Sequence, residues 1–153
     1  MEREYIDLKN ETYNHLMNNR HIVLATSSHG RVTARTISYI VLDNKIMFQT
    51  DSTFLKAKQI KSNNKVALCI DNIQIEGIAK ILGNPFDEYN NKFLKKYKQI
   101  HESAYNKYSH TKNEIVIEVC PILITIWKYE NELGIRKVIN LESQTLETIT
   151  MNI

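Results

Sequence analysis

Short apolar runs joined by tight turn signals constrain this sequence more than any other feature. HIVLATSS (21–28) and RVTARTISYIVL (31–42) are separated by only two residues, a His-Gly pair. Asp43 and Asn44 then lead into KIMFQT (45–50), and both residue types tolerate the positive φ that tight hairpins require. This spacing predicts antiparallel hairpins.

The remaining segments predict further strands and three helices. Amphipathic spacing predicts helices at 2–19, about 53–62, and 85–108. Apolar runs predict strands at 65–71, 73–82, 114–121, 122–129 and 135–142, and the ending SQTLETITMNI is ambiguous. Gly77, inside one of these runs, indicates a bulge or a close approach by another group. Because strands and helices do not alternate regularly, we expect an α+β fold, a small antiparallel split β-barrel with peripheral helices, in one domain spanning 1–153.

Composition narrows the classes of function. With 153 residues, 42% hydrophobic and 24% charged, the chain is typical of a globular protein. No apolar run approaches the roughly 20 residues that span a bilayer, and the N-terminus is too polar for a signal peptide, so a cytoplasmic protein without a membrane partner is expected. The net charge of +3 permits an anionic ligand and does not demand nucleic acid. Cys69 and Cys120 lie in apolar runs, which favours buried thiols over a disulfide or a metal site.

Familiar catalytic and metal-binding motifs are missing. The sequence contains no GxSxG, P-loop, GxGxxG, CxxC or HExxH pattern. Its five histidines are scattered without metal-ligand spacing. We therefore predict no metal site and assign no catalytic residue.

Polar residues at unusual positions in strands form the first candidate site. Alternation places Arg35, Ile37 and Tyr39 on one face of the strand and Thr36, Ser38 and Ile40 on the other, so one of the two faces must line something polar. Thr50 and Ser52 stand where a strand meets a helix N-terminus, whose free N–H groups favour an anion. The ammonium of Lys56 can reach the same point. The alternative is that Asp51, Ser52 or Thr53 caps the helix and that Lys56 is a solvated lysine.

Two further residues could contact a planar ligand, but each also has an ordinary structural role. Gln74 could hydrogen-bond a heterocycle or could be an exposed edge residue. Trp127 is the only tryptophan, and its default role is core packing. Arg136 and Lys137 follow after a predicted turn, and the lysines between 92 and 112 are interpreted as a solvated face.

Taken in order, three segments resemble the pyridoxamine 5'-phosphate oxidase-like family of flavin mononucleotide (FMN)-binding split-barrel proteins, and within it the small general-stress-protein type. These segments are HIVLATSSHGRVTARTISYI, FQTDSTFLKAKQIKSNNKVAL and IQIEGIAKILGNP. The resemblance covers about 21–82, and more loosely 114–141. It implies a homodimer with FMN at the subunit interface and a small-molecule substrate.

The resemblance also implies a set of cofactor-binding residues. The family's Arg-x-[Val/Ile] segment, which contacts the flavin and its phosphate, matches RTISYI with Arg35, Thr36 and Ile37. Its aromatic-Thr step matches Gln49 and Thr50, its phosphate-binding lysine falls on Lys56, and Ser52 would add a hydrogen bond. The glutamine that touches the flavin ring matches Gln74, and the tryptophan and distal basic residue match Trp127 and Lys137.

Departures from the family pattern limit the expected activity. The phosphate-binding arginine falls on Leu55 and the oxidase's substrate-binding lysine on Ile40. The oxidase's late arginine and histidine fall on Leu133 and Ile135. The resemblance therefore implies a flavin-dependent oxidoreductase that is not a true pyridoxamine phosphate oxidase. A non-catalytic flavin- or haem-binding sensor stays open, with His21, His29 or His101 as axial ligands, and a single-stranded nucleic-acid barrel is disfavoured because most aromatics lie in the helices.

Overall fold

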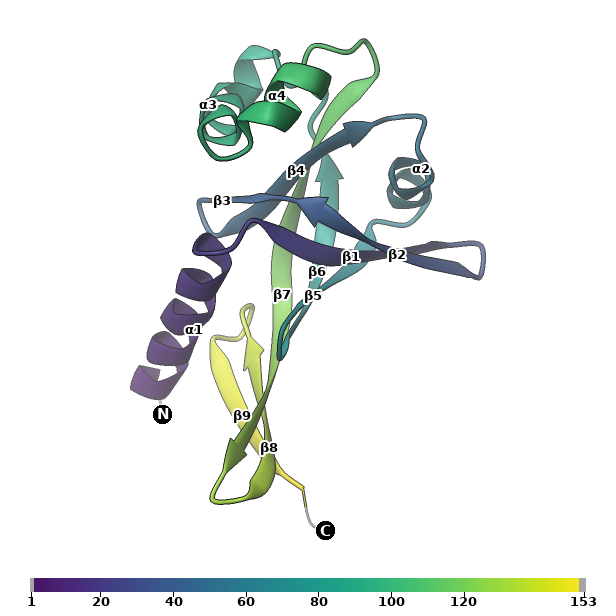
Figure 1. Cartoon of the computed structure of the whole chain (residues 1–153). Helices are drawn as coiled ribbons and strands as arrows, with labels where there is room; N and C mark the ends of the chain where they lie inside the picture. The colour runs from purple at the N-terminus through teal and green to yellow at the C-terminus, as the bar shows by residue number, and fades with distance from the viewer. Residues whose placement is uncertain (1, 152–153) are drawn as a thin grey trace.

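A computed structural model describes residues 2–151, in which a curled antiparallel sheet is surrounded by short helices (Figure 1). Its helices are α1 (Glu2–Met17), α2 (Leu55–Ser62), the 3-10 turn η1 (Glu88–Asn90), α3 (Asn91–Ile100) and α4 (Glu102–Tyr108). Its strands are β1 (His21–Ser28), β2 (Arg31–Ser38), β3 (Ile40–Leu42), β4 (Lys45–Asp51), β5 (Lys65–Ile70), β6 (Ile73–Ile81), β7 (Glu114–Glu130), β8 (Leu133–Asn140) and β9 (Thr145–Thr150). The predicted α+β class and antiparallel pairing are confirmed. The ambiguous ending forms β9, apart from 152–153, which lie outside the described residues.

Tyr39 closes the barrel. The strand order β2-β1-β5-β6-β7-β4-β3 places β2 and β3 at opposite ends, yet Tyr39 alone separates them in sequence. The sheet must therefore curl until its two ends meet. Tyr39 is buried there, and its hydroxyl donates to the carbonyl of Leu16 at 2.6 Å. The prediction of one continuous strand over 31–42 is wrong, because the chain changes sheet edge at this residue.

The predicted strands 114–121 and 122–129 are in fact one long strand, β7. The proline between them, Pro121, lies opposite Gly77, where the pairing register of β6 and β7 shifts. A Cβ atom on Gly77 would lie 2.7 Å from Val119 Cγ1 and 2.8 Å from the carbonyl oxygen of Cys120. The predicted bulge and close approach at Gly77 are both confirmed, and the bulge accommodates a proline that cannot donate to the ladder.

The helix predicted at 85–108 is interrupted at His101. Its backbone there leaves the helical region, with φ −124° and ψ 55°, and α3 ends while α4 begins. The imidazole of His101 is buried, and its Nε2 lies 2.7 Å from the carbonyl oxygen of Tyr39. Aromatic periodicity continues on both sides of the break, so the local pattern gave no sign of this contact with the barrel.

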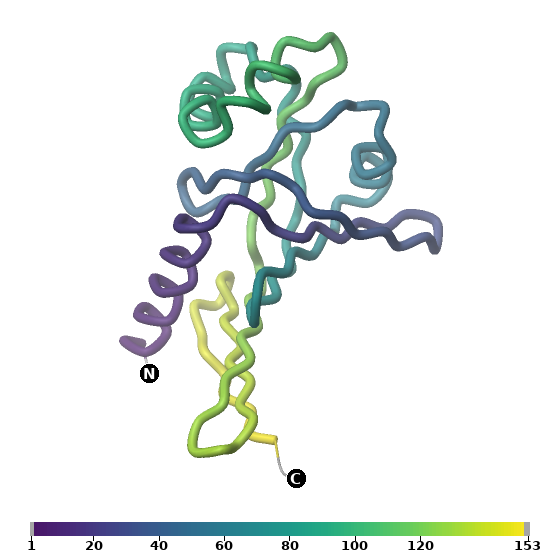
Figure 2. Tube along the Cα trace, viewed as in Figure 1, coloured from purple at the N-terminus to yellow at the C-terminus, as the bar shows by residue number. Residues whose placement is uncertain are grey.

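The apolar core fills the barrel and continues beneath α1. The helix α1 lies beside the β8–β9 hairpin, which extends below the barrel (Figure 2). A second cluster lies under α3 and comprises Ile40, Met47, Phe93, Tyr97 and Val116. No helix within 2–151 is long and apolar enough to cross a membrane.

Both cysteines, which the sequence predicted to be buried, lie on the outer face of the sheet. Cys69 and Cys120 are free and exposed, so the prediction of buried thiols is wrong. In β5 the exposed Cys69 alternates with the buried Leu68, and in β7 Cys120 follows the buried Val119. An apolar run on a curled sheet therefore need not be buried on both faces.

Candidate functional site

Arg35 is held in place by neutral polar side chains on the inner face of the β1–β2 hairpin. Its NH1 donates to Thr26 Oγ1 at 2.9 Å and to the carbonyl of Leu24 at 3.1 Å, and its NH2 donates to Thr33 Oγ1. Both hydroxyls donate in turn to Oε1 of Gln59, at 2.5 Å from Thr26 and 2.7 Å from Thr33. Three of the five guanidinium N–H groups are thereby engaged, and two are left for a ligand.

The start of α2 presents free backbone donors. The helix begins at Leu55 after Phe54, and no side chain caps it. Oδ1 of Asp51 accepts instead from the backbone N–H and the hydroxyl of Thr53, at 2.8 and 2.6 Å. The capping alternative is therefore wrong, and the first N–H groups of α2 have no side-chain partner, which is the condition that favours an anion.

Lys56 lies on the first turn of α2, half-buried, with its ammonium 5.2 Å from the ring centroid of Phe54. Burial lowers the pKa of Lys56, and the nearby positive charge of Arg35 lowers it further. Burial also lowers the pKa of Arg35. Within the described part of the chain neither cation has a carboxylate within 4.0 Å. Two cations therefore share a half-buried site without a close counter-ion.

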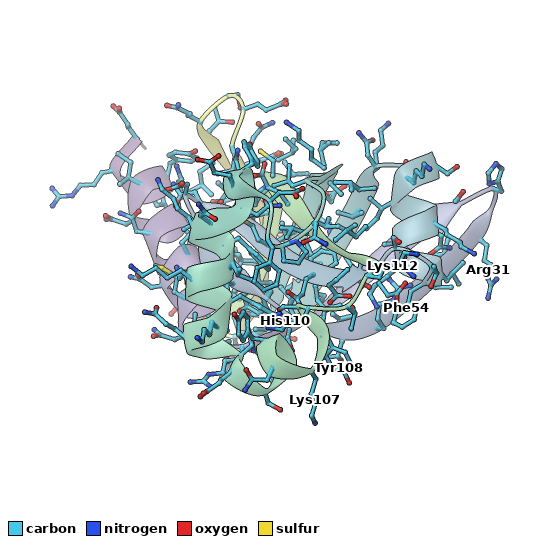
Figure 3. All side chains as sticks on the ribbon, turned by 90° about the horizontal axis from the view of Figure 1, so that it is seen from above. Arg31, Phe54, Lys107, Tyr108, His110 and Lys112 are labelled. Carbon is cyan, nitrogen blue, oxygen red and sulfur yellow. The ribbon has the colours of Figure 1, made fainter. Side chains whose placement is uncertain are left out.

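The end of β4 contributes the predicted residues Gln49, Thr50 and Ser52. Among residues 2–151 the buried hydroxyl of Thr50 has no hydrogen-bond partner, and neither does the buried Nε2 of Gln49. Oε1 of Gln49 accepts from the hydroxyl of Ser109 at 2.8 Å. The backbone N–H of Ser52 donates to the carbonyl of Asn113 at 2.8 Å. This bond joins the loop before α2 to the loop before β7, and Phe54 and Lys112 from these loops lie on the same side of the molecule in Figure 3.

Glu114 is a site residue that the sequence did not reveal. It lies opposite Asp51 in the β4–β7 ladder and is 5% exposed. Burial raises the pKa of Glu114 to about 7, the negative charge of Asp51 adds to the rise, and Gln49 and Lys56 oppose it. The carboxyl is therefore close enough to Lys56 for the charge of each to affect the pKa of the other. Only the pairing of β4 with β7 brings it there, so no local pattern could have found it.

Thr36 and Gln74, two of the predicted cofactor-binding residues, lie on the opposite face of the sheet from Arg35. Thr36 points outward because it follows Arg35 in β2, and it is exposed opposite Val23. Gln74 is likewise exposed, in register with Cys69 on β5. Ile37 returns to the inner face and is buried in the barrel core.

Trp127 is also on the outer face, and the expectation of core packing is wrong. Its side chain is 46% exposed, and the guanidinium carbon of Arg136 lies 5.4 Å from its ring centroid. Arg136 is directly opposite Trp127 in the β7–β8 ladder. Lys137 projects to the other face, where Nζ lies 3.0 Å from Glu4 Oε1 on α1 and 3.2 Å from Thr148 Oγ1. The cation beside Trp127 is therefore Arg136, whereas Lys137 lies on the face toward α1.

A family model described as pyridoxamine 5'-phosphate oxidase matches residues 10–128. The chain belongs to this family. The match includes the two cations Arg35 and Lys56, which we call the clamp, and also Trp127. It ends before Lys137. It confirms the resemblance inferred from the sequence. No curated protein matches the chain.

Solved structures of family-like proteins share the fold. A pyridoxamine 5'-phosphate oxidase-related, FMN-binding protein from Nostoc punctiforme is 16% identical with a TM-score of 0.66, and the match covers 99% of this chain and 96% of that chain. General Stress Protein 26 from Bacillus anthracis is 20% identical with a TM-score of 0.62, over 76% and 91% of the two chains. HutZ from Vibrio cholerae, described as a heme storage protein, is 11% identical with a TM-score of 0.63, over 72% and 88%. The predicted split-barrel fold is thus confirmed.

The structure shows where the residues lie at which this sequence departs from the family pattern. Leu55, at the family's arginine position, is exposed at the start of α2 and adds no charge to the clamp. Ile40, at the oxidase's lysine position, is buried in the cluster under α3. Thr26, Thr33 and Gln59 were missed, although the alternation of β2 already placed Thr33 on the face of Arg35.

Proposed function

We propose that this protein binds FMN, with the phosphate held between Arg35, Lys56 and the first N–H groups of α2. The observation that carries the proposal is the pair of half-buried cations with no carboxylate within 4.0 Å in the described residues. Like charges in a partly desolvated site repel one another unless an anion compensates them. A phosphate dianion satisfies both cations and the uncapped helix terminus at once.

The clamp fits a phosphate group rather than a simple carboxylate counter-ion. Arg35 offers two remaining N–H groups in a fixed orientation, Lys56 offers a mobile ammonium, and α2 adds backbone donors. The orphaned hydroxyl of Thr50 lies on the strand that leads to this point. When bound, FMN would supply the transfer of a hydride or of electrons. The protein's part is to bind and orient the cofactor, so we propose a flavin-dependent oxidoreductase.

The substrate of this oxidoreductase differs from pyridoxamine phosphate in our proposal. The oxidase's substrate-binding lysine is replaced by Ile40, which is buried among apolar side chains. Leu133 and Ile135 replace the two late polar residues, and neither can bind a phosphate ester. Family membership therefore supports the cofactor more strongly than the reaction.

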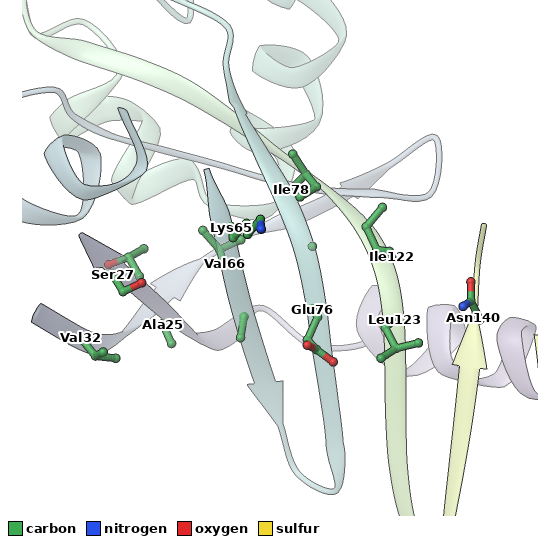
Figure 4. Close-up of a pocket in the computed structure, with 13 residues that line it drawn as sticks. Ala25, Ser27, Val32, Lys65, Val66, Glu76, Ile78, Ile122, Leu123 and Asn140 are labelled. Atoms are coloured by element: carbon green, nitrogen blue, oxygen red, sulfur yellow. The ribbon is translucent and has the colours of Figure 1, made fainter. Parts of the chain in front are cut away.

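We also propose a homodimer in which the outer face of the sheet is the subunit interface. An apolar cavity of about 550 Å³ lies on this face, lined among others by Ala25, Val32, Ile78, Ile122 and Leu123 (Figure 4). A contiguous exposed apolar surface is typical of an interaction site. Thr36, Gln74 and Trp127 share this face but are separated from the clamp by the thickness of the sheet. A second copy packed on this face would cover these three residues.

Flavin binding is tested directly by titrating the purified protein with FMN and following flavin absorbance and fluorescence. Removing a charge-assisted hydrogen bond to phosphate costs about 1.5 to 3 kcal/mol. Lys56→Ala should therefore raise the Kd for FMN by roughly 10- to 150-fold. The matched control is Lys58→Ala, which removes an exposed lysine from the same helix and should leave the Kd within about twofold. Failure of the wild-type protein to bind FMN would contradict the proposal.

Haem is the second candidate ligand, favoured by the likeness of the fold to HutZ. Two of the histidines proposed as axial ligands, His21 and His101, lie together with ring centroids 6.1 Å apart. His29 is at the tip of the β1–β2 hairpin, where Nδ1 lies 2.7 Å from Ser28 Oγ. Adding haem and scanning for a Soret band distinguishes this candidate from flavin. Equal affinity for haem in Lys56→Ala and wild type, with no flavin binding, would favour it.

A further inference from the structure

A second polar pocket lies away from the phosphate clamp, between α4 and the point where β1 begins and β2 ends. Its volume is about 500 Å³. Arg20, His21 and Ser38 line one wall, and His101, Lys107 and Tyr108 line the other. In Figure 3, which shows the molecule from above, Lys107 and Tyr108 are labelled where they project from α4. None of the residues assigned to the flavin site lines this pocket.

His101 lines the pocket and is held by a contact with the barrel. The side chain is 8% exposed, and its Nε2 lies 2.7 Å from the carbonyl oxygen of Tyr39. A carbonyl oxygen only accepts hydrogen bonds, so Nε2 must carry the proton. Burial lowers the pKa of His101, the Tyr39 bond opposes this, and the charges of His21 and Arg20 lower the pKa further. In the neutral ring Nδ1 is therefore a bare acceptor, in an orientation set by Tyr39.

The charges around this acceptor favour an anion. Arg20 is fixed by the bond from NH1 to the carbonyl of Ile100 at 3.3 Å, and Lys107 lines the wall formed by α4. Glu102 also lines the pocket and is exposed, so two permanent cations face one carboxylate. Hydroxyl groups from Ser38 and Tyr108 add neutral partners.

We propose that this pocket binds a small organic anion that carries a hydroxyl or amino group. Arg20 and Lys107 attract its carboxylate or phosphate, and Nδ1 of His101 accepts the hydrogen bond from its hydroxyl or amine. A ligand with the donor gains one hydrogen bond over a ligand of equal charge that lacks it, so the pocket discriminates between the two.

The position of the pocket links it to the proposed flavin site. His21 and Ser38 are paired across β1 and β2, two residues along from Val23 and Thr36. Two residues of a strand span about 7 Å, and side chains two apart share a face. A molecule in the pocket would therefore lie beside the outer-face residues proposed to contact the flavin ring. Its use as the substrate of the oxidoreductase rests on the proposed function, whereas binding of the anion does not.

Isothermal titration with four probes tests the proposal on flavin-free protein. The probes are L-malate, succinate, glycerol 3-phosphate and inorganic phosphate. Malate and succinate differ by one hydroxyl, so malate should bind about three- to tenfold more tightly, the range for one neutral hydrogen bond. Glycerol 3-phosphate should exceed inorganic phosphate for the same reason. Binding of none of the four at millimolar concentration, or equal affinity within each pair, would overturn the proposal.

Two variants assign the effect to named residues. His101→Gln keeps a donor for the Tyr39 carbonyl and replaces the Nδ1 acceptor by an amide oxygen at a different position, so the ratio between malate and succinate should fall toward one. Lys107→Ala should weaken both probes by the same factor, and Lys95→Ala, an exposed α3 lysine outside the pocket, should change neither. Equal losses in Lys95→Ala and Lys107→Ala would show non-specific charge attraction and contradict the site.

An NMR measurement on the wild-type protein tests the role of His101 even if the His101→Gln variant does not fold. The ¹⁵N resonance of His101 Nδ1 should move when malate is added and stay unchanged with succinate. No movement of this resonance under malate saturation would exclude His101 as the acceptor. Repeating the titration with FMN present then shows whether the pocket and the flavin site affect each other.

Discussion

The guanidinium of Arg35 owes its position to three neutral side chains. The hydroxyls of Thr26 and Thr33 each accept a hydrogen bond from Arg35 and donate one to Gln59. The hydrogen bonds therefore all run in one direction, from Arg35 through the two hydroxyls to Oε1 of Gln59. Nε2 of Gln59 completes the set by donating to the carbonyl of Arg31 at 3.2 Å. A clamp with its cation oriented before the ligand arrives loses less conformational entropy on binding.

Glu114 predicts an unusual dependence of stability on pH. Its pKa is raised to about 7 in the folded protein, against an ordinary value of 4.5. Below pH 4.5 the carboxyl is protonated in both states. Between 4.5 and about 7 the folded state retains a proton that the unfolded state releases, so the free energy of unfolding falls as the pH rises. The rise in pKa corresponds to about 3 kcal/mol.

Glu114→Gln should remove this dependence. Urea unfolding of both proteins at about pH 5 and about pH 8 should show that wild type loses about 2 to 3 kcal/mol relative to the variant between the two conditions. Asp51→Asn provides the check on the cause, because removing that negative charge should reduce the loss without abolishing the larger effect of burial. Parallel pH profiles for wild type and Glu114→Gln would contradict the prediction.

At the scale of elements, β7 connects the barrel to the β8–β9 hairpin. Its first part pairs with β4, its middle and later parts with β6, and its last part with β8. The bulge opposite Gly77 lets the strand bend while it passes from the barrel into the hairpin. The position of Trp127 beside Arg136 depends on this continuity.

Gly77→Ala should therefore destabilise the protein. The new Cβ would meet Val119 Cγ1 at 2.7 Å and the carbonyl of Cys120 at 2.8 Å, and a backbone contact cannot relax by a rotamer change. Overpacking of this kind costs about 1 to 3 kcal/mol. The matched control is Gly134→Ala in β8, whose Cβ would come no closer than 3.9 Å to Met151 and should change stability by less than about 0.5 kcal/mol. Chemical denaturation of both variants measures the difference, and equal stabilities would refute the steric argument.

At the scale of the whole molecule, the two proposed halves of the flavin site lie on opposite faces of the sheet. The clamp is on the inner side near α2, and Thr36, Gln74 and Trp127 are on the outer side. A single copy cannot enclose a flavin ring between them. The proposed homodimer would cover the apolar outer face and the residues on it.

Ile78→Glu tests this arrangement. Ile78 is exposed on the outer face and lies opposite Lys65 in the β5–β6 ladder, so a carboxylate there is tolerated by a single chain. Burying it in an interface of apolar side chains is costly. Light scattering should give about twice the 17.9 kDa chain mass for wild type and a monomer for the variant. Tyr89→Glu, an exposed change on η1, should leave the dimer intact, and a dimeric Ile78→Glu protein would place the interface elsewhere.

Local patterns determined much of the secondary structure and half of the candidate site. Alternation and turn residues predicted β1 at its observed bounds and a turn at Asp43 and Asn44, whose φ values are 51° and 61°. The same alternation placed Arg35 on one face with Ile37 and Tyr39, and the step from strand to helix placed Lys56 within about the first turn of α2. These features depend on residues close in sequence, whose periodicity reports backbone geometry directly.

Only the tertiary structure decided which distant residues meet. The chain changes sheet edge at Tyr39, the helix breaks at His101, Glu114 joins the clamp through the β4–β7 ladder, and Lys137 pairs with Glu4 instead of accompanying Trp127. Each of these depends on contacts between segments far apart in the chain, such as the 62 residues between Tyr39 and His101. Burial and hydrogen bonding at such contacts outweigh local propensity, which is worth about 1 kcal/mol or less per residue. The sequence by itself therefore determined most of the strands and the alternation of side chains along them, whereas barrel closure determined the second pocket and brought Glu114 close to Lys56.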